Sequence, residues 1–170
     1  GSEMCIRDRV ETVRQALDLG RVHLLGHSWG GWLSIEYAIH HPQAIKSLIL
    51  ENTAADIPHL TGELERLRAA LGSETVAMMQ RFEALGQLDH PQYQAAITLL
   101  NYRHVCRLDQ WPAPLQRSLG DWNMGPYGTI QGPNEFLYTG NLKDWNRLKE
   151  MGGFKMPVLI TTGPVSYTHL

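Results

Sequence analysis

Cysteine is scarce in this chain, which holds only Cys5 and Cys106 among its 170 residues. The two lie far apart and match no spacing used to bind a metal, and they give no disulfide framework. We therefore expect reduced thiols and a cytoplasmic protein, and we predict neither a metal nor a cofactor.

The chain also lacks long apolar runs and an excess of either charge. No run approaches the roughly 20 residues of a membrane span. Lys and Arg total 15 against 17 Asp and Glu, a net charge of -2. This balance excludes the basic surface that binds nucleic acid or an anionic membrane. With 43% apolar and 19% charged residues, the composition is that of a globular domain whose partner is a small molecule.

The first part of the chain alternates between helix and strand patterns. Apolar residues at helical spacing predict a short amphipathic helix over Val10–Leu19. Short apolar runs predict buried strands at Val22–Leu25 and Ile45–Leu50, and the apolar stretch Trp29–Ile39 predicts the helix between them. Strand, helix and strand in this order favour parallel pairing. Residues 157–163 return to the strand pattern.

A different pattern covers residues 56–143, which are rich in Leu, Ala, Met and Glu and predict a helical cap inserted into the α/β part. We expect Asp89 to cap a helix that runs on through Leu100. Proline and glycine are frequent over residues 111–136, so we expect irregular backbone there that shapes the rim of a pocket. The aromatic residues of the cap either line that pocket or form the cap's own core: Trp111, Trp122, Tyr127 and Tyr138.

Both ends of the chain look foreign to this fold. Met4–Arg9 and Pro164–Leu170 resemble translated adapter sequence at the ends of a fragmentary gene, and we leave both out of the fold prediction. The predicted parts are a foreign segment at 1–9, an α/β part at 10–55, the cap at 56–143, a return to the α/β part at 144–163, and a foreign tail at 164–170.

Gly26, Ser28 and Gly30 form a G-x-S-x-G pentapeptide between the predicted strand and helix. A serine in this context sits on a sharp turn that exposes its hydroxyl, so Ser28 is the candidate nucleophile. We expect a side chain at Gly26 or Gly30 to collide with neighbouring backbone. The backbone N–H of Trp29 is the candidate oxyanion-hole donor. The alternative is an ordinary glycine-rich turn.

Three blocks of the sequence carry a family resemblance: Leu24–Gly31, the cap block Gln131–Phe136 with Thr139–Gly140 and Lys143–Trp145, and Pro157–Gly163. Together they resemble the proline iminopeptidases of the α/β-hydrolase fold. The resemblance implies an α/β protein with part of that fold, a parallel sheet with the nucleophile elbow plus a helical cap. It also implies cleavage of an N-terminal residue, often proline, from a peptide or amide through an acyl-enzyme on Ser28.

The resemblance further implies how the free amino terminus of a substrate is recognised. A desolvated ammonium group needs a carboxylate partner, and the family supplies acidic residues. Glu135 matches that position, with Asn134 and Phe136 shaping the pocket beside it. The alternative is that Glu135 sits in the first turn of a helix, where its charge complements the helix dipole.

The catalytic acid and base are not found in this sequence. In this fold the triad runs serine, acid, histidine along the chain, and no carboxylate follows Gly163. His169 lies in the foreign tail and is not assigned. We assign surface or capping roles to the acids and histidines in or beside the cap: Asp121, Asp144, His90 and His104. We therefore expect the triad Asp and His to be absent and the chain to be nearly inactive.

Two other functions stay open. Another capped α/β hydrolase, such as an esterase, a lactonase or a C–C bond hydrolase, would share Ser28 and have no use for an acidic amine site. A non-catalytic hydrolase-fold fragment is the second alternative. Because the predicted sheet lacks neighbours, we also expect exposed strand edges that permit self-association.

Overall fold

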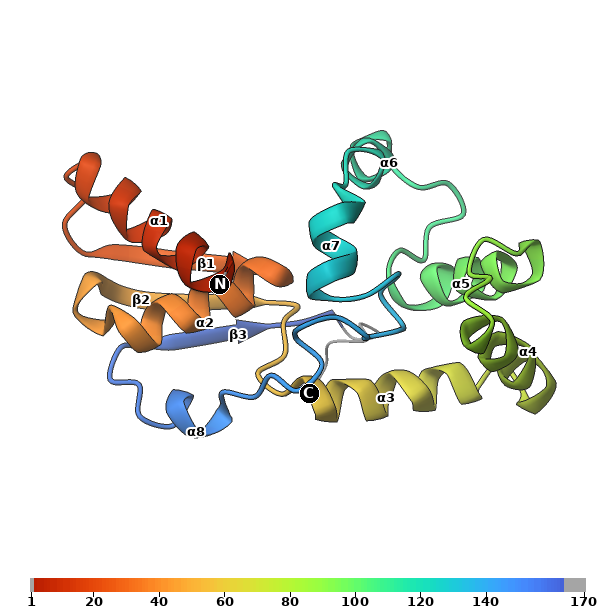
Figure 1. The fold of residues 1–170 in the computed structure, drawn as a ribbon. Coiled ribbons are helices and arrows are strands. Elements are labelled where there is room, and N and C mark those ends of the chain that lie inside the picture. Colours follow the sequence, from red (N-terminus) through yellow and green to blue (C-terminus); the bar gives the residue numbers. More distant parts are fainter. Residues whose placement is uncertain (1, 164–170) are drawn as a thin grey trace. The chain divides into compact units, whose positions relative to one another are not determined.

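The structure is a computed structural model that describes residues 2–163, with side chains described from residue 7 onward. The predicted foreign tail, including His169, lies outside the described residues. Figure 1 labels the α-helices and strands. The elements are α1 (Ser2–Ala16), β1 (Val22–His27), α2 (Trp29–His40), the 3-10 helix η1 (Pro42–Ala44), β2 (Ile45–Glu51), α3 (Ile57–Ala69), α4 (Ser73–Ala84), α5 (Pro91–His104), α6 (Ala113–Gly120), α7 (Met124–Ile130), α8 (Leu148–Met151) and β3 (Val158–Thr161).

The chain divides into two compact units. The first comprises the residues up to Asp56 together with those from Asn146 onward, and the second is Ile57–Trp145. The second unit overlaps the helical cap predicted at 56–143, and the predicted division into five parts stays a prediction. No helix among residues 2–163 is long and apolar enough to cross a membrane.

The sheet of the first unit has three parallel strands in the order β1-β2-β3. This confirms the α/β class and the parallel pairing expected from strand, helix and strand. Leu25 pairs with Ile49, and Ile49 pairs with Leu159, so these three side chains share one face. Leu25 is 54% exposed and Leu159 56% exposed, so this face is open to solvent within the described residues.

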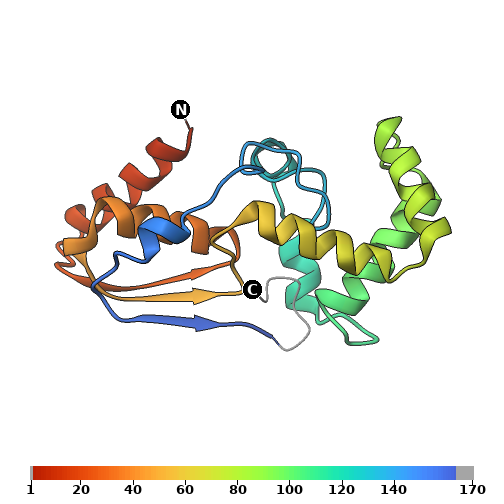
Figure 2. The ribbon, with the colours of Figure 1, turned by 90° about the horizontal axis from the view of Figure 1, so that it is seen from below.

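Helix α2 packs on the sheet, and α1 and α8 contact α2 (Figure 2). The apolar side chains of α2, including Ile35 and Ala38, are buried, as are Leu48 and Leu50 of β2. The indole Nε1 of Trp32 donates to the carbonyl of Ala54 at 2.9 Å. A helix that is apolar on nearly every side is thus enclosed, as its sequence predicted.

The predicted helix at Val10–Leu19 is found, but its bounds differ. Helix α1 already begins at Ser2, within the segment expected to be foreign, and it ends at Ala16. It ends there because Asp18 has a φ of 49°, in the left-handed region that stops a helix. The N–H of Leu19 then donates to the carbonyl of Arg14 at 3.1 Å.

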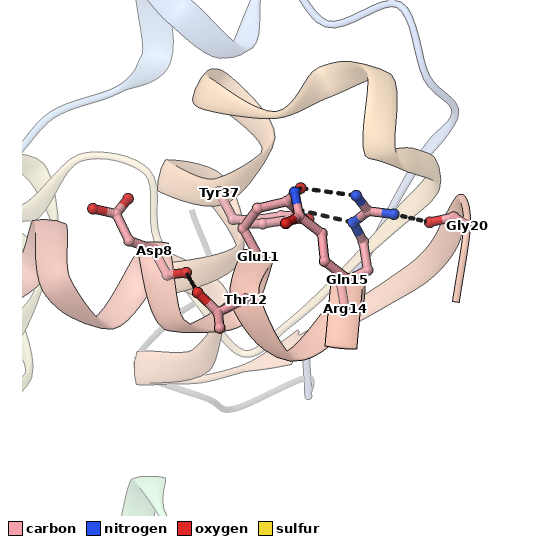
Figure 3. Close-up of polar contacts among 7 residues, drawn as sticks. All are labelled: Asp8, Glu11, Thr12, Arg14, Gln15, Gly20 and Tyr37. Carbon is pink, nitrogen blue, oxygen red and sulfur yellow. Dashed lines mark hydrogen bonds and ion pairs between the residues drawn. The ribbon is translucent and has the colours of Figure 1, made fainter. Parts of the chain in front are cut away.

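Glu11 joins α1 to α2 through a cluster of charged and polar side chains (Figure 3). Its carboxylate accepts from Arg14 Nε at 2.9 Å and Nη2 at 2.8 Å, from Gln15 Nε2 at 2.6 Å, and from the Tyr37 hydroxyl. The Arg14 and Tyr37 hydrogen bonds hold the pKa of Glu11 well below its ordinary value. Burial, and then the Glu11 carboxylate, raise the pKa of Tyr37 to about 12, so its hydroxyl stays a donor.

The Glu11 cluster makes stability depend on pH. Because the pKa of Glu11 is lowered on folding, its stabilising contribution is complete above the unfolded value of about 4.3 and is lost as pH falls below it. Glu11→Gln should therefore reduce the free energy of unfolding at pH 7, with a gap to wild type that shrinks below about pH 4. Denaturant unfolding at pH 7 and pH 3.5 measures the gap. Tyr37→Phe should lower the free energy of unfolding by about 1–2 kcal/mol at pH 7. A gap between Glu11→Gln and wild type that is equal at both pH values would contradict the predicted pH dependence.

Two predictions for the cap were wrong in detail. The segment expected to be irregular contains α6 and α7, because Pro114 and Pro126 fall in the first turns of these helices, where proline is tolerated. The cap residue of α5 is His90 and not Asp89, because Pro91 occupies the first helical position and the residue before it becomes the N-cap. His90 Nδ1 accepts from the N–H of Gln92 at 3.3 Å.

Candidate active site

Ser28 lies between the end of β1 and the start of α2, as predicted. Its φ of 52° and ψ of -122° are unfavourable for a residue with a Cβ. Main-chain hydrogen bonds hold this conformation: the N–H of Ser28 donates to the carbonyl of Glu51, and the N–H of Gly31 donates to the carbonyl of Ser28, each at 2.9 Å. The serine is therefore presented by backbone, with strain that the surrounding strands and helix maintain.

Gly26 is required by close packing at this turn. A Cβ there would lie 2.3 Å from the carbonyl oxygen of Gly30 and 2.5 Å from Oγ of Ser34. The collision expected at Gly30 is not found, since a Cβ at that position would meet nothing within 4 Å. The contact is one-sided because Gly30 presents its carbonyl to Gly26, while its own Cβ direction is open.

Gly31 is a second required glycine that the pentapeptide did not identify. A Cβ at Gly31 would lie 2.4 Å from Cγ2 of Thr53, which follows β2. Among residues 2–163, Thr53 Oγ1 is a buried side-chain oxygen with no hydrogen-bond partner. The signals for Gly31 in the sequence are its position as the second of two adjacent glycines and its place at the end of the block Leu24–Gly31.

Trp29 is the first residue of α2, a position whose N–H has no acceptor one turn earlier in the helix. Its role as oxyanion donor stays a prediction. Two histidines of the first unit have polar partners of their own: His23 Nδ1 lies 2.7 Å from Oγ of Ser47, and His40 Nδ1 lies 2.8 Å from the carbonyl oxygen of Glu36.

The residues of the cap that were assigned other roles are placed accordingly. Asp121 is the C-cap of α6, and Asp144 is exposed in a turn. His90 caps α5 and stacks on Phe82, with ring centroids 4.0 Å apart. His104 lies in the last turn of α5, with its ring edge-on to Phe136 at 6.5 Å.

Glu135 lies in a tight turn, and not at the start of a helix. An antiparallel bridge joins Asn134 to Leu137, with Glu135 and Phe136 between them. The alternative that Glu135 complements a helix dipole is therefore excluded. Gly132, with a φ of 148°, allows the approach, because a Cβ there would lie 2.2 Å from the carbonyl oxygen of Leu137.

Tyr127 holds one oxygen of Glu135. Its hydroxyl donates to Oε1 of Glu135 at 2.7 Å and accepts from Nε2 of Gln131 at 2.9 Å. Burial, followed by the charge of Glu135, raises the pKa of Tyr127 far above its ordinary value. The same two causes raise the pKa of Tyr138. The negative charge of Glu135 thus lies near the half-buried phenol of Tyr127 and the buried phenol of Tyr138.

Asn134 and Phe136 have structural roles that the sequence did not indicate. Phe136 is 2% exposed and belongs to the core of the second unit. Asn134 Oδ1 accepts from the N–H of Phe136 at 2.9 Å, and its Nδ2 donates to the hydroxyl of Tyr93 at 3.1 Å. Their predicted place in the pocket wall stays a prediction.

Asn134 is the end of a longer hydrogen-bond chain. The Tyr93 hydroxyl donates to Oε1 of Glu83 at 3.1 Å, and Glu83 forms an ion pair with the buried Arg68 at 2.6 Å. Burial raises the pKa of Tyr93 to about 12. This chain connects α3, α4 and α5 to the turn that carries Glu135.

Four aromatic residues of the cap pack in two pairs. Trp111 lies against Tyr102, with ring centroids 5.2 Å apart, and Trp122 lies against Tyr127 at 4.8 Å. Within residues 2–163, no group of three or more His, Cys, Asp or Glu side chains is arranged to hold a metal ion.

The two predicted sets of site residues occur in different units. Ser28, Trp29 and the elbow glycines are brought together in the first unit, and the turn that carries Glu135 belongs to the second. Tyr127 and Gln131 form the hydrogen-bond chain that ends at Glu135, and the sequence singled out Tyr127 only as an aromatic residue of the cap. The only signal for Gln131 was its place in the cap block.

Comparison with known proteins agrees with this architecture. A family model described as "alpha/beta hydrolase fold" matches residues 2–166. The proline iminopeptidase of Saccharolobus solfataricus is 32% identical over 156 residues, which are 90% of this chain and 50% of that protein. This chain spans about half the length of the curated relatives it matches.

Two solved structures are similar over nearly the whole chain. The crystal structure of the proline iminopeptidase of Mycobacterium smegmatis matches with a TM-score of 0.85 and 34% identity, over 99% of this chain and 57% of that one. The crystal structure of VinJ matches with a TM-score of 0.91 and 27% identity, over 99% of this chain and 58% of that one. With the strand, Ser28 and helix in place and a family model that matches nearly all of its length, the chain belongs to the α/β-hydrolase fold family.

Proposed function

We propose that this chain is part of a serine exopeptidase of the proline iminopeptidase type. In this proposal Ser28 attacks the carbonyl carbon of the N-terminal residue, often proline. The C–N bond breaks, the shortened peptide leaves with a proton on its new amino group, and water then hydrolyses the acyl-enzyme. The observation that carries the proposal is the strained φ of 52° at Ser28 between β1 and α2.

The cap supplies the second half of the proposal. Glu135, held by the Tyr127 hydroxyl at 2.7 Å, would accept hydrogen bonds from the substrate ammonium group, with Asn134 and Phe136 beside it. Such charge-assisted bonds are about twice as strong as neutral ones. The relatives named proline iminopeptidase support this choice over an esterase, a lactonase or a C–C bond hydrolase. Those other enzymes would also have no use for an amine site.

We further propose that the triad Asp and His, and a second oxyanion donor, lie outside this sequence, so that the chain alone is nearly inactive. Loss of triad members costs several orders of magnitude in turnover.

The proposal keeps the cytoplasm as the compartment, consistent with the free thiol of Cys106. It includes self-association through β1 and β3, the outer strands of the sheet.

The amine site is tested with Glu135→Gln in the complete reading frame that contains this chain. We expect turnover of proline p-nitroanilide to fall at least tenfold, because the ammonium loses a charged acceptor. Turnover of a simple acetyl ester should be unchanged. Glu65→Gln, at an exposed position of α3 in the same unit, is the matched control and should alter neither reaction.

Two outcomes would contradict the proposal. An equal loss on both substrates would mean that Glu135 supports the structure and not the recognition of the amine. Robust hydrolysis of proline p-nitroanilide by the 170-residue chain itself would show that its own residues supply the acid and the base.

A further inference from the structure

Tyr127 is placed to control the direction of the Glu135 carboxylate. A phenol hydroxyl has one proton to donate and lone pairs that accept. Nε2 of Gln131 donates to the Tyr127 oxygen at 2.9 Å, and that oxygen lies 2.7 Å from Oε1 of Glu135. Because the amide already donates to the phenol, the phenol's own proton points to Glu135.

Gln131 is itself fixed by the main chain. It is 3% exposed and follows directly after α7. Its N–H donates to the carbonyl of Tyr127 at 2.9 Å, and its carbonyl accepts from Thr139 at 3.0 Å and Gly140 at 2.9 Å. The backbone N–H and the backbone carbonyl of Gln131 are therefore both hydrogen-bonded, which fixes the residue whose side chain orients Tyr127.

The phenol also stays neutral. Burial and the charge of Glu135 both disfavour the phenolate, which raises the pKa of Tyr127. Tyr127 therefore remains a hydrogen-bond donor at neutral pH. Its ring is packed against Trp122, with centroids 4.8 Å apart.

The same order of groups occurs a second time in the cap. There an amide, Asn134, donates to a phenol, Tyr93, which donates to a carboxylate, Glu83. That chain ends in an ion pair with the buried Arg68 and fixes the residue directly before Glu135. The turn is thus held from both sides by amide, phenol and carboxylate.

We propose that Tyr127, oriented by Gln131, is a positioning residue that sets the orientation of the Glu135 carboxylate for a primary or secondary ammonium group of the ligand. This inference rests on the proposed function, in which Glu135 binds that group. Tyr127 acts through Glu135, because its hydroxyl is spent on Oε1. A carboxylate held in its binding orientation loses less conformational entropy when the ligand binds, which increases affinity.

The experiment uses the 170-residue chain and two ligands, prolinamide and N-acetylprolinamide, whose affinities are measured by NMR titration. The acetylated ligand has no ammonium group, so the ratio of the two affinities reports amine recognition. Tyr127→Phe should lower this ratio about tenfold or more, as expected for the loss of a hydrogen bond to a charged group. Gln131→Met should give a smaller loss, because Tyr127 keeps its proton but loses its orientation.

Two further variants separate positioning from a general disturbance of the cap. Tyr102→Phe removes the same hydroxyl from an exposed phenol of α5 and should leave the ratio unchanged. The double variant Tyr127→Phe with Glu135→Gln should match Glu135→Gln alone, because Tyr127 has no effect without the carboxylate. Losses that simply add would indicate a general disturbance and overturn the inference.

The outcomes also separate this inference from the proposed function. If Glu135→Gln lowers the affinity ratio and Tyr127→Phe does not, the inference fails and the proposed amine site stands. If Glu135→Gln leaves the ratio unchanged, or if the wild-type chain does not prefer prolinamide, the amine site fails and the inference fails with it.

Discussion

Ser28→Gly is expected to stabilise the chain while removing its nucleophile. The φ of 52° and ψ of -122° at Ser28 strain a residue with a Cβ by about 1–3 kcal/mol, and glycine adopts such angles without that cost. Glycine also has more conformational freedom in the unfolded chain, which offsets up to about 1 kcal/mol of the gain. The net increase in the free energy of unfolding should be about 1 kcal/mol or slightly more, measured by denaturant unfolding.

Ser28→Ala is the control for this effect. Alanine removes the hydroxyl but keeps the Cβ, so it should leave the strain and the stability nearly unchanged. In the complete reading frame both variants should reduce turnover by roughly 10⁴–10⁶, as expected when an acylated serine is lost. Equal stability of the glycine and alanine variants would show that the backbone at Ser28 stores no strain.

Gly26→Ala is expected to destabilise the first unit by about 3 kcal/mol, at the upper end of the cost of overpacking. The new Cβ would lie 2.3 Å from the carbonyl oxygen of Gly30 and 2.7 Å from its carbonyl carbon. These are backbone atoms at the start of α2, so relief requires the helix to move away from β1. The measurement is the midpoint of thermal or denaturant unfolding.

Gly30→Ala is a matched control from the same pentapeptide. Its Cβ would meet nothing within 4 Å, and alanine favours a helix over glycine by up to about 1 kcal/mol. We expect this variant to be as stable as wild type or more stable. Equal destabilisation by the two alanines would contradict the one-sided contact between Gly26 and Gly30.

The elbow and the sheet could be predicted because their signals are local. The apolar runs at β1 and β2, with an apolar helix between them, fix strand direction through the order of the elements. The two glycines of the pentapeptide, however, look equivalent in the sequence. Which of them needs to lack a Cβ depends on the direction in which Gly30 points its carbonyl, and only the structure shows this.

The surroundings of Glu135 could not be predicted for a different reason. Arg68, Glu83, Tyr93 and Asn134 come from four separate segments, so no spacing along the chain relates them. The helices α6 and α7 could not be predicted from their proline-rich segment, because proline also suits the first turn of a helix, as Pro114 in α6 shows. A count of prolines cannot separate these two uses.

The points at which the chain leaves and re-enters the first unit lie side by side, and this has a consequence for protein engineering. Asp56 forms an antiparallel bridge with Asn146, and the N–H of Arg147 donates to the carbonyl of Ala55 at 2.8 Å. Within the cap, the N–H of Ile57 donates to the carbonyl of Trp145 at 2.9 Å. The chain therefore leaves the first unit and returns to it at one isolated antiparallel bridge, and we expect the intervening 89 residues, Ile57–Trp145, to be replaceable as one piece. We expect a cap of another length, joined at the same two peptide bonds, to leave the main-chain hydrogen bonds of Ser28 with Glu51 and Gly31 in place.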